Sequence, residues 1–189
     1  MNTLISGGCK NGKSYYAQKL ARDMSREGGK PLYYIATMIP GDDEDRARIR
    51  RHLAERDGWG FETLEQPRDL TALLDAPAVD KTGVFLLDSV TAIMENEMFR
   101  RVGPGRRGSG DIEIVFDENA EERVKADMTV FAKATGNTVF VSDGIYGDMG
   151  EYSASTEAYR RALASVDRAL AETCDRVIEI AYGIEEVWK

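Results

Sequence analysis

Apolar residues along this chain follow two alternating patterns, short continuous runs and longer stretches with helical spacing. The short runs, typical of buried strands, cover residues 2–6, 31–37, 83–88, 137–143 and 176–181. Helical spacing covers residues 13–26, 42–56, 89–100, 118–135 and 154–173, and weaker patterns predict a short strand at 59–65 and a short helix at 68–75. Because strands and helices alternate, the sequence predicts an α/β fold, with a mainly parallel sheet and helices on both faces.

Two segments fall outside this alternation. Residues 101–110 are rich in glycine and arginine and predict no regular element. One interpretation is an exposed insertion, and the other is a lid that brings Arg106 or Arg107 to a phosphate. The residues after 181 are expected to form a short polar tail.

Length and charge restrict the class of protein. The 189 residues suit a single domain, 1–189, and the 42% of hydrophobic residues suffice for a packed core. Lys and Arg number 25 against 33 Asp and Glu, a net charge of −8, which disfavours broad attraction to nucleic acid or anionic lipid. No run approaches the roughly 18 apolar residues of a membrane span, so the expected location is the cytoplasm. The two cysteines, Cys9 and Cys174, lack the spacing of a zinc site.

The strongest chemical signal is a phosphate-binding P-loop, GxxxxGK[ST], between the first predicted strand and the first helix. Its glycines let successive backbone N–H groups point at phosphate oxygens, and the helix N-terminus adds partial positive charge. Lys13 is expected to reach the outer phosphates and to act in catalysis, while Ser14 is expected to bind Mg²⁺. The fold class is therefore P-loop NTPase-type. The predicted nucleotide-binding residues of the loop are Gly7, Gly8, Cys9, Lys10, Asn11, Gly12, Lys13 and Ser14.

A P-loop usually works with an acidic residue at the end of another strand, which holds the metal ion or its water shell. Asp88 ends the apolar run 83–88 and is the preferred candidate for this metal site. Asp88 also suits the N-cap of the following helix. Asp143, at the end of the run 137–143, is a second candidate for the metal.

The only histidine, His52, follows Arg48 and Arg51 at spacings that place all three on one helix face. Two guanidinium groups beside an imidazole could hold a phosphate next to a nucleophilic ring nitrogen, oriented by Glu55 or Asp45. The spacing alone fits a solvated surface histidine as well.

Several of these segments together resemble a known family, the bifunctional adenosylcobinamide kinase / adenosylcobinamide-phosphate guanylyltransferases of cobalamin biosynthesis. The matching features are the early P-loop, the strand Tyr34-Ile-Ala-Thr37, the pattern D-E-x-x-x-R-I-x-x-H from Asp43 to His52, Leu87-Asp88 with Thr91, Val141-Ser142 and Gly183-Ile184. The resemblance runs over nearly the whole chain.

The resemblance implies an activity. In that family the histidine matched by His52 takes up GMP from GTP, so we expect a guanylyl-His52 phosphoramidate, with Thr37, Arg48 and Arg51 also binding nucleotide. The implied sequence is phosphorylation of the adenosylcobinamide hydroxyl by ATP or GTP, followed by transfer of GMP to the new phosphate, with Mg²⁺ as cofactor. The implied partners are the nucleotide, a corrinoid and further copies of the chain, as a trimer.

The chain departs from the family pattern at four places, one of which is the Arg/Gly loop at 101–110. The first of two adjacent family histidines is Arg51, the N-E-V-G loop becomes Asp143-Gly-Ile-Tyr146, and an asparagine-glutamine pair becomes Asp167-Arg168. Two alternatives therefore stay open: a P-loop kinase acting on another small alcohol or phosphate, and a non-catalytic nucleotide-binding regulatory protein.

Overall fold

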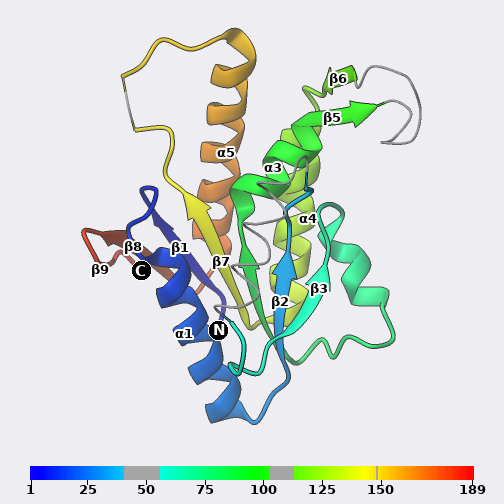
Figure 1. Ribbon diagram of the computed structural model, residues 1–189, viewed down its shortest axis with the longest axis vertical. Coiled ribbons are helices and arrows are strands. Elements are labelled where there is room, and N and C mark those ends of the chain that lie inside the picture. Colours follow the sequence, from blue (N-terminus) through cyan, green and yellow to red (C-terminus); the bar gives the residue numbers. More distant parts are fainter. Residues whose placement is uncertain (41–55, 103–112, 148) are drawn as a thin grey trace.

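The computed structural model describes residues 1–40, 56–102, 113–147 and 149–189. Among these residues, seven strands form one sheet in the order β3-β2-β4-β7-β1-β8-β9 (Figure 1). The strands are β1 Thr3–Gly7, β2 Leu32–Ala36, β3 Glu62–Glu65, β4 Val84–Asp88, β7 Thr138–Asp143, β8 Arg176–Ala181 and β9 Ile184–Val187. Six of them run parallel, and β9 pairs antiparallel with β8 at one edge.

Helices cover both faces of the sheet, as predicted. They are α1 Lys13–Gly28, α3 Val90–Met98, α4 Ala120–Thr135 and α5 Ala154–Thr173, with a 3₁₀ helix at Leu70–Asp75. Helix α1 lies on one face, and α3, α4 and α5 lie on the other (Figure 1). The predicted α/β class with a mainly parallel sheet is confirmed.

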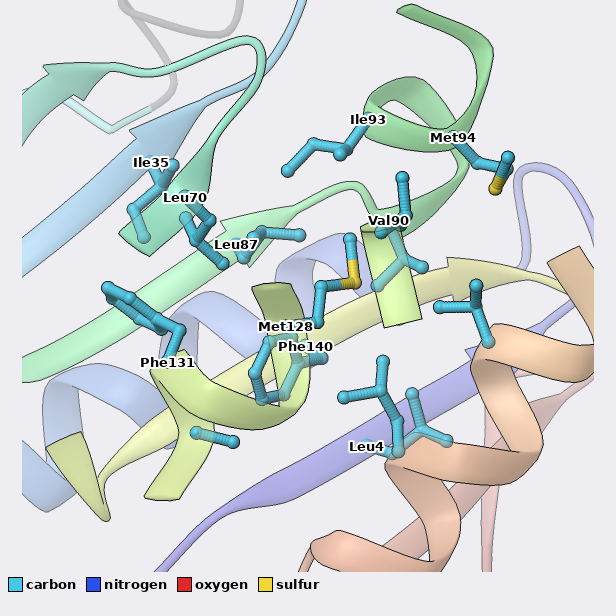
Figure 2. Packing of buried hydrophobic residues seen from close by; sticks show 14 of the residues in the cluster. Leu4, Ile35, Leu70, Leu87, Val90, Ile93, Met94, Met128, Phe131 and Phe140 are labelled. Atoms are coloured by element: carbon cyan, nitrogen blue, oxygen red, sulfur yellow. The ribbon is translucent and has the colours of Figure 1, made fainter. Parts of the chain in front are cut away.

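Alternating side chains of the strands feed two separate cores. In β1, Leu4 packs with the helices α3, α4 and α5, whereas its neighbour Ile5 packs with α1. The larger core has Phe140 of β7 and Phe131 of α4 at its centre, both fully buried (Figure 2). Because successive side chains of a strand point to opposite faces, strands covered on both faces are apolar throughout. This is why the sequence showed continuous apolar runs.

Two local predictions were wrong. The helix predicted at 89–100 ends at Met98, and β5, Phe99–Val102, pairs antiparallel with β6, Glu113–Phe116, in a small second sheet. The predicted polar tail contains the edge strand β9, whose side chains are exposed. The sequence of β9 carries little apolar signal, because none of its side chains is buried. Residues 103–110 of the predicted loop and most of the helix predicted at 42–56 lie outside the described residues.

In the described part of the chain, no helix combines the length and the apolarity needed to cross a bilayer.

Candidate functional site

The predicted P-loop lies at the carboxyl edge of the sheet, between β1 and α1 (Figure 1). Two of its glycines adopt positive φ angles, 153° at Gly7 and 93° at Gly12. A Cβ atom at Gly7 would overlap the backbone carbonyl oxygen of Ile180 in β8. Gly12 occupies the N-cap position of α1 in a left-handed conformation that favours glycine. The loop therefore needs glycine at both positions for physical reasons.

The loop is tied to the neighbouring strand by a side chain. The Asn11 amide donates a hydrogen bond to the Ile180 carbonyl, and its Oδ1 accepts one from the backbone N–H of Lys13 at 3.3 Å. Gly8, Cys9, Lys10 and Gly12 are exposed. The loop is thus held in place by β8 while its outer backbone remains accessible to an anion.

The Lys13 side chain, only 8% exposed, lies beneath the loop. Its ammonium group donates to the Gly8 carbonyl at 3.1 Å and forms an ion pair with Asp143 at 2.6 Å. Asp143 stands opposite Gly7 in the register of β1 and β7, so the parallel sheet brings the two together. The structure thus places the Lys13 ammonium group directly under the P-loop, between Gly8 and Asp143.

Asp88 ends β4, which is separated from β1 by β7. In register it pairs with Val141, two residues before Asp143. Asp143 is therefore the acidic residue next to the P-loop, and Asp88 lies one strand further away. Both carboxylates are partly exposed at the carboxyl edge of the sheet.

Thr37 joins the ends of two strands. Its hydroxyl donates to the Asp88 carbonyl at 3.3 Å and accepts from the Ser89 N–H at 3.0 Å. Ser89 in turn caps α3 by accepting a hydrogen bond from the Ala92 N–H at 3.2 Å. Since Thr37 is 1% exposed, its visible role is to fix the backbone around Asp88.

Within the described residues, no group of three or more His, Cys, Asp and Glu side chains is suited to hold a metal ion. A P-loop metal site does not need one, because Mg²⁺ is usually held by one or two carboxylates, phosphate oxygens and water. Ser14, at the start of α1, and the carboxylates of Asp88 and Asp143 carry oxygen atoms of the kind that such a site would use. The predicted residues Arg48, Arg51 and His52 lie outside the described residues.

The sequence did not single out a pocket of about 580 Å³ behind the P-loop, between β1, β8 and α5. The Asp167 carboxylate in its wall is 5% exposed and accepts hydrogen bonds from Ser142 at 2.8 Å and from the Tyr146 hydroxyl at 3.0 Å. Its other oxygen, Oδ1, is buried and has no hydrogen-bond partner among the described residues.

Burial raises the pKa of Asp167 to about 6, against the two hydrogen bonds that lower it, and the charge of Asp143 raises it further. The structure thus joins Tyr146 and Asp167, two of the positions at which the chain departs from the family pattern. The sequence signal for this contact was that both positions depart from the family pattern. Only the fold, however, places residues 146 and 167 in contact.

Comparisons with known proteins agree with this geometry. The family model described as cobinamide kinase / cobinamide phosphate guanyltransferase matches residues 3–187. The bifunctional adenosylcobalamin biosynthesis protein CobP of Pseudomonas aeruginosa is 30% identical over 184 residues, covering 97% of this chain and 95% of that protein. The corresponding protein CobU of Escherichia coli is 26% identical, with 97% of each chain covered.

One solved structure extends the comparison of the fold. The flagellar accessory protein FlaH from Methanocaldococcus jannaschii aligns with a TM-score of 0.50 and 11% identity, over 100% of this chain and 77% of that one. At this identity the similarity concerns the fold alone.

Proposed function

This chain belongs to the cobinamide kinase / cobinamide phosphate guanyltransferase family, and we propose that residues 7–14 bind the nucleoside triphosphate in both of its reactions. The observation that supports this most directly is the position of Lys13, held under an exposed loop of backbone amides. Its ammonium group neutralises negative charge where the phosphates bind. The described loop thus supplies positioning and charge, the main requirements of phosphoryl transfer.

In the kinase step, the hydroxyl oxygen of adenosylcobinamide attacks the γ-phosphorus of ATP or GTP. The bond between that phosphorus and the β–γ bridging oxygen breaks, and the nucleoside diphosphate leaves. The hydroxyl proton passes to solvent. Because the transition state is loose, the reaction needs alignment and charge neutralisation more than a strong base.

In the guanylyl step, a ring nitrogen of His52 attacks the α-phosphorus of GTP, and pyrophosphate leaves. An oxygen of adenosylcobinamide phosphate then attacks the same phosphorus and breaks the P–N bond, which gives adenosylcobinamide-GDP. The role of His52 rests on the sequence pattern from Asp43 to His52, and Arg48 and Arg51 are proposed to neutralise the α-phosphate. The loop would then hold the departing pyrophosphate.

Mg²⁺ is proposed to bind at Ser14 and Asp88, where it would neutralise phosphate charge. Lys13 would add its own positive charge to this neutralisation. We also propose that three copies of the chain assemble as a trimer. Light scattering coupled to size-exclusion chromatography measures the mass of this assembly directly.

The test is covalent labelling with Mg²⁺ and GTP carrying label in the α-phosphate, followed by denaturing separation. Wild type should retain label in an acid-labile, base-stable bond, and His52→Ala should lose it. Glu172→Gln, an exposed change on α5, serves as a control that should label normally. If wild type binds GTP yet carries no label, the guanylyl-histidine proposal fails. The kinase activity is then tested separately, by measuring whether release of the γ-phosphate depends on added adenosylcobinamide.

A further inference from the structure

Asp167 is a buried carboxylate with no part in either of the proposed reactions. It lies on α5, where Leu163, Val166 and Leu170 of the same helix are buried in the larger core. The packed helix therefore holds the Asp167 side chain in a fixed place. Because burial of a carboxylate costs free energy, and because its Oδ1 has no hydrogen-bond partner among the described residues, packing alone does not explain this side chain.

The hydrogen bonds of Asp167 connect α5 to both ends of one short segment, residues 142–146. Ser142, near the end of β7, donates to Oδ2 of Asp167 at 2.8 Å, and the Tyr146 hydroxyl donates to the same oxygen at 3.0 Å. Asp143 lies between these two contacts. A segment that is fixed at both ends retains little conformational freedom, because few backbone dihedral angles remain between the fixed points.

This segment also lies against the P-loop. The Gly144 N–H donates to the Gly7 carbonyl at 3.1 Å, and the Asp143 N–H donates to the Thr91 hydroxyl of α3 at 3.0 Å. The Asp143 carboxylate forms the ion pair with Lys13. Contacts from the P-loop, α3 and α5 together fix the Asp143 backbone in the position from which its carboxylate reaches the lysine.

We propose that Asp167 is a positioning residue, which holds Asp143 in its ion pair with Lys13 through the hydrogen bonds from residues 142 and 146. It thereby limits how readily the lysine is released to incoming phosphate. This inference rests on the proposed function of the P-loop. The connection is particular to this chain, because residues 146 and 167 are two of the positions at which the sequence departs from the family pattern.

The experiment measures binding of inorganic tripolyphosphate in the presence of a metal chelator, by titration calorimetry. The double variant Ser142→Ala/Tyr146→Phe removes both hydrogen-bond donors and leaves every charge in place. It should tighten binding about threefold, which is less than the roughly fivefold effect of losing the whole ion pair. Tyr146→Phe alone, at a side chain that is 40% exposed, should disturb folding least and tighten binding about twofold.

Tyr33→Phe is the matched control. The Tyr33 hydroxyl accepts a hydrogen bond from the Asp80 N–H at 3.1 Å, before β4 begins and thus at the edge of the sheet opposite the P-loop. Losing this bond should lower the urea concentration at the midpoint of unfolding without changing tripolyphosphate binding. Tighter binding by Tyr33→Phe would mean that general loosening of the fold is enough, which overturns the inference.

A double-mutant cycle separates positioning from a merely structural effect. In the Asp143→Asn background no ion pair remains to be positioned, so Ser142→Ala/Tyr146→Phe should leave tripolyphosphate binding unchanged. The inference is wrong if these substitutions tighten binding equally in both backgrounds, or if they fail to tighten it in wild type. If wild type does not bind tripolyphosphate at all, the phosphate site itself is rejected, and the inference fails with it.

Discussion

The ammonium group of Lys13 lies 2.6 Å from a carboxylate oxygen of Asp143, so the cation expected to contact phosphate forms an ion pair inside the protein. The contact follows from the sheet order, which places the end of β7 beside the start of the P-loop. Incoming phosphate must compete with Asp143 for this lysine.

We therefore predict opposite effects of two substitutions on phosphate binding. Asp143→Asn should tighten tripolyphosphate binding about fivefold in the presence of a metal chelator, because an ion pair worth about 1 kcal/mol no longer opposes it. Lys13→Ala should weaken the same binding. Calorimetric titration measures both, with Glu172→Gln as the neutral control. Weaker binding by Asp143→Asn would contradict this account of the ion pair.

The metal ion distinguishes the two strand-end carboxylates. If Asp88 holds Mg²⁺ or its water shell, Asp88→Asn should raise the Mg²⁺ concentration for half-maximal turnover by about tenfold or more. Asp143→Asn should change it little. A Mg²⁺ titration of activity on both variants decides the question, and the reverse pattern would assign the metal to Asp143.

The buried carboxylate of Asp167 predicts a pH-dependent stability. Its pKa is raised from 3.8 to about 6 in the folded protein, so folding favours the protonated form. The resulting stabilisation is fully present below about pH 4 and is lost as the pH rises through 6. With about 1.4 kcal/mol for each pKa unit, the loss reaches at most about 3 kcal/mol.

Asp167→Asn should abolish this dependence, because an amide can accept the bonds from Ser142 and Tyr146 without ionising. The free energy of unfolding of wild type should therefore fall relative to the variant between pH 4 and pH 7. Urea unfolding at several pH values measures the difference, in which the other titrating groups cancel. A difference that stays constant over this range would contradict the raised pKa.

The P-loop could be predicted from sequence because its chemistry is local. The strand, the glycines, Lys13 and Ser14 lie within a dozen consecutive residues, and each has a physical role that its neighbours in the chain explain. The β-strands that are buried on both faces could likewise be predicted from the sequence, because each needs apolar residues throughout its length. The family pattern around His52 is also a property of neighbouring residues, and its role stays a prediction.

Tertiary structure alone decided which distant residues meet. Sequence spacing could not choose between Asp88 and Asp143 as the neighbour of Lys13, because strand order is set by how the helices pack across the sheet. In the same way, only the fold brings the Tyr146 hydroxyl within hydrogen-bonding distance of Asp167. Only the fold, too, places the turn between β8 and β9 beside the P-loop. Local sequence patterns indicate the conformation of a single segment, whereas the contacts between segments depend on the free energy of the whole folded protein.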